Sequence, residues 1–450
     1  MSRLSAPFEN RFRAPSSIFW TALLVRIAYI ALGHTFRITP HNNHFEFGWE
    51  TGRVAASLAQ GHGYSSPFSG NTGPTAWMVP VFTLLLAGVF KVFGVYTPLS
   101  AWVIQSLDSL FQALTVLFVF EMGVRVAGRR TALWAAWIWA LYPGIIQYGV
   151  KWIWETSLST MLFAWVLVLG MRMRSIGDPQ LPATQRVRNW ASFGLLWGVI
   201  AMTNPTLILL APVQGIWILA GLAQRKAFIR QAALAILAAA LCAAVCAPWV
   251  IRNWLAFHAF IPTRGNFGAE AAMAWAPDSI GMPWGATVPT VELAPEHKLY
   301  ARMGERAYVQ MRGQLAWQWA RAYPVHFWKL VVWRFYMFWA GVPHTAAPSV
   351  AEDIREAAHC LTSIAGILGL LLALRRKLPA ADLFAWAVVL LPAIYYFIIP
   401  GSRFRNPLEP FFAILIVYLF QQTEGRWGFS IPVLRQLWPA SHPRSLSSAT

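Results

Sequence analysis

Residues 74–94 read PTAWMVPVFTLLLAGVFKVFG, and the placement of this apolar run decides how the whole chain is threaded. If the run crosses a membrane, every later loop changes side. A helix needs about 20 apolar residues to cross a bilayer core, and this run reaches that length only with Pro74 and Pro80 near its start, where proline favours an irregular backbone. We therefore expect the run to lie on, or dip into, one membrane face.

The composition indicates a membrane protein. Of the 450 residues, 57% are hydrophobic and only 12% are charged, and apolar runs close to a bilayer crossing recur along the chain. The sequence predicts an all-α, polytopic integral membrane protein, with one membrane domain over residues 1–425 and a loose cytoplasmic tail over residues 426–450. No hydrophilic block is long enough for a second, soluble domain.

The net charge of +18 comes from Lys and Arg that fall in short clusters between the apolar runs. This pattern is typical of the positive-inside rule, whereas a nucleic-acid groove would interleave basic and aromatic residues. We therefore expect the lipid bilayer, and no nucleic acid, as a partner. The three cysteines, Cys242, Cys246 and Cys360, have neither the spacing of a metal site nor that of a disulfide framework.

Charge parity supports a non-crossing run at residues 74–94, because the basic clusters that follow then share one side of the membrane. These clusters are Arg125, Arg129 and Arg130; Arg172, Arg174, Arg186 and Arg188; Arg225, Lys226 and Arg230; and Arg375, Arg376 and Lys377. The expected location is the inner (cytoplasmic) membrane, with the clusters in the cytoplasm and the opposite loops facing the periplasm or the cell exterior.

We expect about ten membrane spans. They cover residues 17–36, 99–122, 131–149, 156–172, 190–204, 206–222, 231–249, 357–374, 381–399 and 407–422. Two long loops remain outside, over about residues 37–98 and 250–356. Amphipathic patterns at residues 48–60, 298–319 and 326–340 predict interfacial helices within these loops.

Charged residues, scarce elsewhere, gather in the outer loops. They are Glu46, Glu50, Arg53, Lys151, Glu155, Arg252, Arg264, Arg403 and Arg405. A carboxylate that removes a proton, placed beside cations that hold an anionic leaving group, suits a group-transfer reaction. Arginine suits phosphate in particular, because its planar fork donates two parallel hydrogen bonds.

Each of these residues also has a structural interpretation. Glu50 and Arg53 are three positions apart on an expected helix and can form a simple surface pair. Glu155 opens a span, where a carboxylate complements the helix N-terminus. Arg403 and Arg405 flank a turn, where Arg can contact lipid headgroups.

Two ionisable residues, Arg26 and Asp108, fall inside expected spans. Buried charges in a membrane are costly and usually paired or functional, so we expect these two to pair with each other. The alternative function is a lipid or solute transporter, or a flippase. A transporter would carry more of its charged residues near the middle of the membrane.

Several motifs occur in a set order along most of the chain, and none is specific alone. They are Glu46 and Glu50 ahead of residues 58–61, the segment 72–77, Gly128-Arg129-Arg130, Tyr142-Pro143 followed by Glu155, Thr203-Asn204-Pro205, Ala247-Pro248-Trp249 with Arg252-Asn253, Asn266-Phe267-Gly268, and residues 403–407. This order resembles the membrane glycosyltransferases of the GT-C fold. The resemblance is to bacterial relatives of the protein O-mannosyltransferases and of the lipid A aminoarabinose transferase (glycosyltransferase family 39-like).

The resemblance implies an inverting transfer of a sugar from a polyprenyl-phosphate carrier to an acceptor hydroxyl on the outer face. The acceptor can be a protein, a lipid or a glycan. The family's base is an Asp in the first outer loop, whereas this chain offers Glu50 or Glu46. Glu155 is expected to orient the acceptor or, with the first-loop acid, to hold a divalent cation (Mg²⁺ or Mn²⁺), although no dedicated metal site is expected.

The resemblance also implies that cations bind the lipid phosphate. Thr75 stands where a Lys is expected, so this role passes to other residues. The expected substrate-binding residues are Arg53, Lys151, Arg252, Arg264, Asn266, Arg403 and Arg405.

Overall fold

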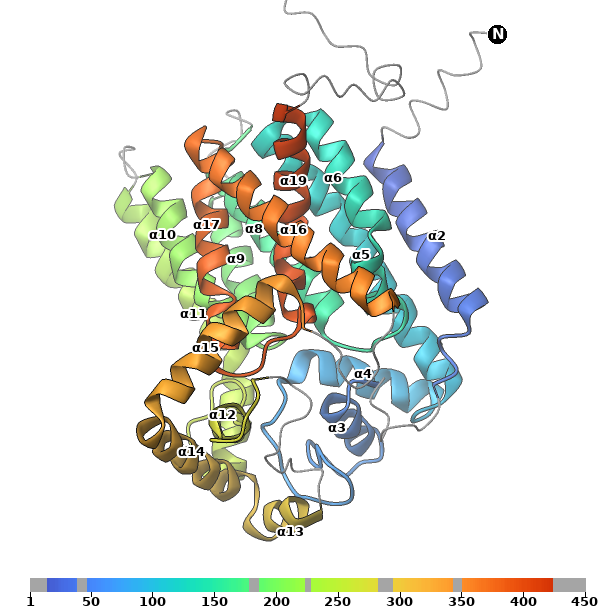
Figure 1. Cartoon of the computed structure of the whole chain (residues 1–450), viewed down its shortest axis with the longest axis vertical. Coiled ribbons are helices and arrows are strands. Elements are labelled where there is room, and N and C mark those ends of the chain that lie inside the picture. The colour runs from blue at the N-terminus through green and yellow to red at the C-terminus, as the bar shows by residue number, and fades with distance from the viewer. Residues whose placement is uncertain are drawn as a thin grey trace, which may run out of the picture.

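The computed structural model describes residues 14–38, 47–177, 186–222, 228–281, 294–342 and 350–423. Within these ranges the regular secondary structure is helical, apart from an isolated bridge between Ser65 and Pro74. The helices form two layers, a bundle of roughly parallel helices and, at one end of it, a layer of shorter ones (Figure 1). The chain is a helical, multi-pass membrane protein, as the sequence predicts.

Five of the described helices are long and apolar enough to cross a membrane by length and composition. They are α2 (Pro15–Gly33), α5 (Pro98–Ala127) and α8 (Thr156–Met173), together with Ile229–Phe257 of α11 (Phe228–Phe257) and Asp353–Arg375 of α16 (Val350–Arg375). The other expected spans form shorter helices within the same bundle (Figure 1). These are α6 (Arg129–Leu141), α7 (Pro143–Val150), α9 (Arg186–Ala201), η3 (Pro205–Leu209), α10 (Leu210–Leu222), α17 (Ala381–Leu390), α18 (Ala393–Phe397) and α19 (Glu409–Thr423).

Proline and glycine explain where the helices depart from the expected ranges. The expected span 131–149 is divided between α6 and α7 at Pro143, because proline lacks an amide donor and restricts the residue before it. The expected interfacial helix 298–319 is divided at Gly304, whose φ of 77° favours glycine. The result is α13 (Ala294–Met303) and α14 (Glu305–Ala322). Pro248, in contrast, lies inside α11, which continues to Phe257, so the outer segment begins later than expected.

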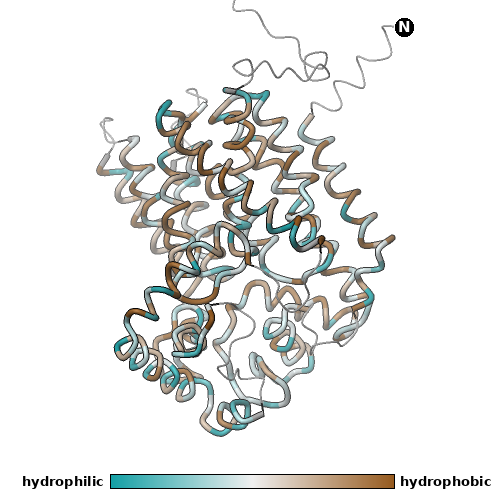
Figure 2. The backbone as a smooth tube through the Cα atoms, viewed as in Figure 1, coloured by the Kyte–Doolittle hydropathy of each residue, from teal (hydrophilic) through white to brown (hydrophobic). Residues whose placement is uncertain are grey.

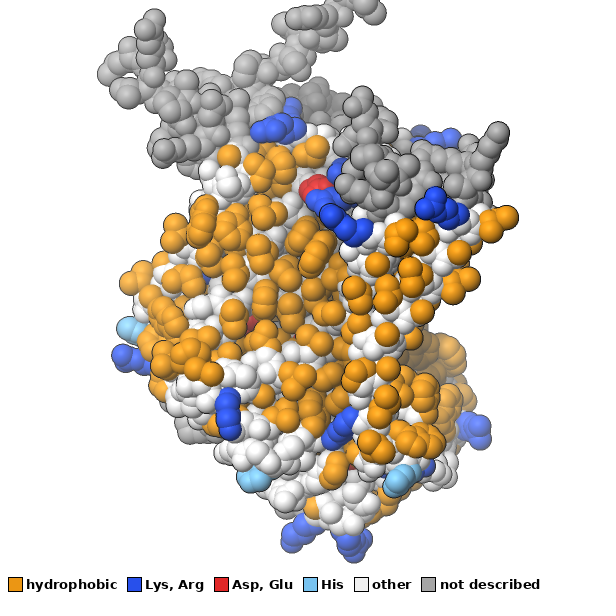
Figure 3. Space-filling model, turned by 180° about the vertical axis from the view of Figure 1, so that it is seen from behind, with side chains coloured by type: hydrophobic (Ala, Val, Ile, Leu, Met, Phe, Trp, Pro, Cys, Tyr) orange, Lys and Arg blue, Asp and Glu red, His pale blue; other side chains and the backbone are white. Residues whose placement is uncertain are grey.

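The outer surface of the bundle is apolar. Hydrophobic residues dominate the bundle helices, whereas the shorter layer is more polar (Figure 2). Along α11, Ile229 is 85% exposed, and Ile236 and Leu255 are each 71% exposed. Figure 3 shows the resulting apolar belt, with Lys and Arg gathered mainly toward its two ends. A surface of this kind is stable only against lipid.

The run that decides the topology forms α4 (Pro80–Phe93), which lies across the end of the bundle (Figure 1). Its 14 residues span roughly 21 Å at 1.5 Å per residue, less than the ~30 Å of a bilayer core. The turn between α5 and α6 and the turn between α16 and α17 lie at the opposite end, on the side where α2 begins (Figure 1). This arrangement agrees with the non-crossing placement and with basic turns on one side.

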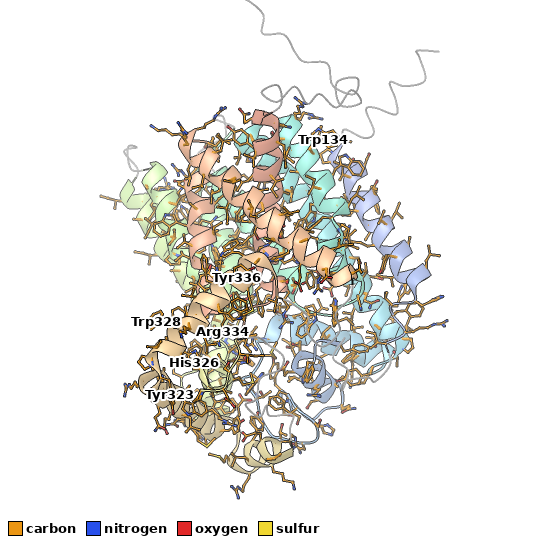
Figure 4. All side chains as sticks on the ribbon, viewed as in Figure 1. Trp134, Tyr323, His326, Trp328, Arg334 and Tyr336 are labelled. Atoms are coloured by element: carbon orange, nitrogen blue, oxygen red, sulfur yellow. The ribbon has the colours of Figure 1, made fainter. Side chains whose placement is uncertain are left out.

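Exposed aromatic residues mark both ends of the bundle. Trp134 of α6 lies toward one end, and Trp328 and Tyr336 of α15 (Pro324–Ala340) lie toward the other (Figure 4). Trp328 is 57% exposed and Tyr336 is 56% exposed. Trp and Tyr concentrate at membrane–water interfaces because their rings are apolar and their tips are polar. This distribution supports the expected interfacial helix at residues 326–340.

The expected pairing of Arg26 with Asp108 is wrong. The Arg26 guanidinium instead donates to Gln112 Oε1 at 2.7 Å and to the Ala140 carbonyl at 2.8 Å, which joins α2 to α5 and α6. Asp108 is 1% exposed, and both carboxylate oxygens lack a hydrogen-bond partner among the described residues. An amide and a backbone carbonyl satisfy the guanidinium without the cost of burying a second charge beside it.

Candidate functional site

A cavity of about 500 Å³ lies where the shorter layer meets the ends of the bundle helices. Five of the residues expected from the sequence line it, and they come from four separate parts of the chain. They are Glu50, Glu155, Arg264, Asn266 and Arg403. The structure therefore brings two of the expected carboxylates and two of the expected guanidiniums into one cavity.

Glu50 is the first residue of α3 (Glu50–Ala59), and a glycine two positions earlier sets its place. Gly48 has a φ of +80°, and a Cβ atom there would lie 2.5 Å from the Ile153 carbonyl oxygen. Only glycine allows both this conformation and this close approach. The contact holds the start of α3 against residues 153–155, which end in the second carboxylate of the cavity.

The segment before α8 supplies a carboxylate, Glu155, and an aromatic ring, Trp154, on which Arg403 lies. Glu155 precedes α8 and lines the cavity. The guanidinium of Arg403 lies over the ring of Trp154, with 3.7 Å from Cζ to the ring centroid, and also 4.9 Å from the centroid of Phe404. Arg403 forms no salt bridge with a described carboxylate, so its N–H donors remain available to an anion in the cavity.

Arg264 is held by backbone on the other side of the cavity. Its Nε donates to the Trp77 carbonyl at 2.9 Å, and its Nη2 lies 3.3 Å from Met78 Sδ. The Gly265 amide donates to the Ala76 carbonyl at 2.8 Å. These bonds fix the stem of Arg264 and leave Nη1 without a protein acceptor among the described residues.

A buried carboxylate outside the cavity fastens the backbone that holds Arg264. Glu305, at the start of α14, accepts hydrogen bonds from the Thr75 hydroxyl, from the Ala76 amide at 2.6 Å and from the Tyr300 hydroxyl at 2.7 Å. Three donors to one carboxylate form a strong, fully satisfied network. The first outer loop and the long outer loop are thereby tied together beside the cavity.

The sequence reasoning missed Glu270, the third carboxylate of the cavity. It lies on α12 (Phe267–Trp275), where its Oε1 accepts from Asn266 Nδ2 at 3.0 Å. The scarcity of charge that singled out Glu50 was also available for Glu270. Other polar groups of the lining are Thr83, from the non-crossing run, and Asn204, Thr206 and Tyr395, from expected spans. Asn204 belongs to the Thr203-Asn204-Pro205 motif, whereas the other three carried no signal in the sequence.

Burial and nearby charges act in opposite directions on these carboxylates. Burial raises the pKa of Glu50 above its ordinary value, while its own backbone amide and then Arg264, Arg403 and Arg53 pull it down. Burial likewise raises the pKa of Glu270, against the effect of Arg264. A carboxylate with a raised pKa is a stronger base once it is ionised.

Four of the expected binding residues do not line this cavity. Arg252 donates to the carbonyls of Thr75 and Tyr64, each at 2.6 Å, and therefore supports the first outer loop. Arg405 is 1% exposed and pairs with Glu409, with 2.6 Å between Nε and Oε1. The structure thus gives both side chains bonds within the protein.

Lys151 and Arg53 also lie elsewhere. Lys151 is exposed and lies over the ring of Trp152, at 5.2 Å from the centroid. Arg53 donates to the Pro67 carbonyl at 3.4 Å and lines a different cavity. The alternative first-loop acid, Glu46, lies outside the described residues.

A divalent cation is the cofactor that the sequence left open. In the described part of the chain, no group of three or more His, Cys, Asp or Glu side chains comes together as a metal-binding set. The residues present therefore do not by themselves form such a site, and the reaction steps given below use only side chains of the cavity.

No protein-family model matches the chain, and no curated protein matches it in sequence. Among solved structures it is similar to the oligosaccharyltransferase of Archaeoglobus fulgidus in complex with zinc and sulfate. The TM-score is 0.48 and the identity 13%, over 91% of this chain and 49% of that one. A second structure, AglB of the same organism with an inhibitory peptide and a dolichol-phosphate, gives a TM-score of 0.45 and 13% identity, over 95% and 52%.

The chain thus spans about half the length of these two structures. It is also similar to ArnT from Cupriavidus metallidurans bound to undecaprenyl phosphate, with a TM-score of 0.38 and 12% identity, over 91% of this chain and 78% of that one. These proteins include transferases of the class that the sequence motifs resemble. Because the scores are low, the function proposed below rests on the side chains of the cavity.

Proposed function

We propose that this protein is a membrane glycosyltransferase of the GT-C type that moves a sugar from a polyprenyl-phosphate donor to an acceptor hydroxyl. The observation that carries the proposal is one cavity that holds Glu50 and Glu155 together with Arg264 and Arg403. A base and an anion-binding pair in the same cavity are the two parts that such a displacement needs.

In the proposed reaction, Glu50 takes the proton of the acceptor hydroxyl. The hydroxyl oxygen attacks the anomeric carbon of the sugar and forms the new glycosidic bond, while the bond between that carbon and the phosphate oxygen breaks. The phosphate leaves with the bonding electron pair, and Arg264 and Arg403 stabilise its charge. Attack opposite to the leaving group inverts the anomeric configuration.

The apolar part of the cavity wall supports a lipid-linked donor. Beside the charged groups, the lining includes Phe267, Met273, Ile394, Ile398 and Phe404. Apolar walls with a few convergent polar groups are typical of ligand sites that bind an apolar body and orient a polar head. The cavity lies at the end of the bundle away from the basic turns, so we place the reaction on the extracytoplasmic face.

The direct test is sugar release from a defined donor. Purified full-length protein in lipid nanodiscs is incubated with polyprenyl-phosphate sugars of several types, and free polyprenyl phosphate is measured. We expect turnover with at least one donor. Absence of turnover with all of them, together with flux of the same lipid across liposome membranes, would favour the transporter alternative.

Arg403 should control donor binding. Replacing it with Ala removes charge-assisted hydrogen bonds that each contribute about 1.5–3 kcal/mol, so we expect roughly a 10- to 100-fold rise in the KM for the lipid-phosphate donor. The measurement is steady-state transfer at varied donor concentration. Arg321→Ala, an exposed arginine of α14 outside the cavity, is the matched control and should leave KM unchanged. An equal rise in both variants would refute a specific role for Arg403.

The pH dependence should reveal Glu50. A general base acts in its ionised form, so kcat/KM should fall as the pH drops through the pKa of Glu50. Burial raises this pKa from its ordinary value of 4.5, so the fall should lie above pH 4.5. Arg403→Gln removes a neighbouring positive charge and should move the fall to higher pH. The charge of Glu50 raises the pKa of Glu270, and not the reverse, so Glu270→Gln should leave the fall nearly where it is. Profiles of the three proteins check both expectations, and an unshifted fall or a shift to lower pH in Arg403→Gln would contradict this assignment.

A further inference from the structure

A second cavity, of about 610 Å³, lies beside the first outer loop and is not used by the reaction described above. It is formed by α3, by the loop that follows α3, and by Tyr96 between α4 and α5. Arg53 lines this second cavity, whereas Glu50, three residues earlier on α3, lines the reaction cavity. Residues three apart on a helix lie on the same face, at about 5–6 Å between Cβ atoms, so the two cavities are neighbours along the first turn of α3.

The lining of the second cavity is rich in neutral hydrogen-bonding groups. Six of its side chains are hydroxyls, amides or an imidazole: Ser57, Gln60, His62, Ser66, Ser69 and Asn71. Among the described residues of the lining, Arg53 is the one permanent cation and none is a carboxylate. Groups of this kind both donate and accept hydrogen bonds, which is the chemistry that a polyhydroxylated ligand requires.

Some of these groups are available, and others fix the shape. The Gln60 amide and the His62 ring are exposed and make no hydrogen bond with other described residues. Ser57 Oγ, in contrast, lies 2.8 Å from Ser65 Oγ, and Ser69 is held through its carbonyl by His297 Nε2 at 2.7 Å. The cavity is therefore formed in advance by internal bonds, while its outward groups remain open to a ligand.

Aromatic rings complete the wall. Tyr96 lines the cavity and packs edge-on against Phe47 and Phe90, at 5.1 and 5.2 Å between ring centroids, which holds its ring in place. A fixed ring offers an apolar face to the C–H face of a pyranose, while hydroxyls and amides take up the sugar hydroxyls. An extended peptide would require a free strand edge or a run of apolar anchors, and the described lining has neither.

We propose that this second cavity binds the acceptor, and that the acceptor is a saccharide. The inference rests on the proposed function and names the acceptor class for the same reaction. A bound saccharide would extend across the first turn of α3, so that one of its hydroxyls reaches Glu50 in the reaction cavity. The donor and the acceptor then reach the base from two neighbouring cavities along α3.

Binding is tested first without any turnover. Full-length protein in nanodiscs is probed by saturation-transfer difference NMR with maltotetraose, mannotetraose, chitotetraose and a serine-containing octapeptide. We expect saturation transfer to at least one saccharide. The double variant Gln60→Leu/His62→Leu, which loses two hydrogen-bonding groups, should bind it about tenfold more weakly or worse.

Gln318→Leu, an exposed glutamine of α14 outside the second cavity, is the matched control and should bind like the unchanged protein. If the double variant unfolds at a lower temperature, the truncation Gln60→Ala replaces it. Equal binding by the unchanged protein and the cavity variants, binding of the peptide alone, or no saccharide binding would each overturn the proposal.

Turnover separates this inference from the proposed function. With a donor that is slowly hydrolysed by water, the double variant should keep hydrolysis and lose transfer to the saccharide. If the unchanged protein turns over no donor but still binds a saccharide through Gln60 and His62, the proposed function fails and the saccharide site stands. If donor is hydrolysed normally and transfer is unaffected in the double variant, the site fails and the function stands.

Discussion

Replacing Glu50 with Gln should lower kcat for sugar transfer by about 10²- to 10⁴-fold, the usual contribution of a positioned general base. The amide has nearly the same shape and still fits the lining, but it cannot take a proton from the acceptor. Donor affinity should change little, since Arg264 and Arg403 remain. The measurement is single-turnover transfer at saturating donor, combined with donor binding by the same protein.

The controls distinguish the base from its neighbours. Asp353→Asn, at an exposed carboxylate of α16 outside the cavity, should retain full activity. Glu155→Gln should reduce activity less than Glu50→Gln if Glu155 only orients the acceptor. Full activity of Glu50→Gln would contradict the assignment, and the role would then pass to Glu155 or to Glu46, each tested by its own Gln variant.

Replacing Arg405 with Leu should destabilise the protein by about 3–5 kcal/mol, the usual result of removing one partner of a buried ion pair. Arg405 pairs with Glu409 and donates to the His359 carbonyl at 2.7 Å, to the Thr362 hydroxyl at 2.7 Å and to the Ser363 hydroxyl. These bonds join η4 (Ser402–Leu408) and α19 to α16. Without the arginine, a buried carboxylate is left unpaired.

Thermal unfolding in detergent measures this effect. The double variant Arg405→Leu/Glu409→Leu should recover much of the lost stability, because it removes the unpaired charge as well. Arg403→Ala, two residues earlier, should change donor KM much more than the unfolding temperature. The assignment of Arg405 to stability would be wrong if Arg405→Leu unfolded normally and only lost donor binding.

The fold class could be predicted because it depends on local and additive properties. Apolar runs, proline positions and the spacing of basic clusters are visible along the chain, and they placed α4 across the end of the bundle. The helix breaks were less accessible. Pro143 divides a span while Pro248 does not, since neighbouring helices decide whether a lost backbone bond can be compensated.

The candidate site could be predicted only in part. Scarcity of charge selected Glu50, Glu155 and Arg403, which meet in the cavity. It could not tell Arg264 from Arg252: Arg252 lies near the C-terminal end of α11 and Arg264 shortly after it, and nothing local in the sequence separates their roles. One lines the cavity and the other is bonded to the carbonyls of Thr75 and Tyr64. That difference arises from contacts between distant segments, which no local pattern encodes.

The contact between Gly48 and the Ile153 carbonyl also decides how the spacing of the two acids can change. Here the backbones of two segments that are far apart in the sequence touch directly. Each segment carries one of the two carboxylates, Glu50 and Glu155. The approach leaves no room for even one methyl group at position 48. Main-chain atoms, and not side chains that a substitution could shorten, therefore set the spacing of the two acids.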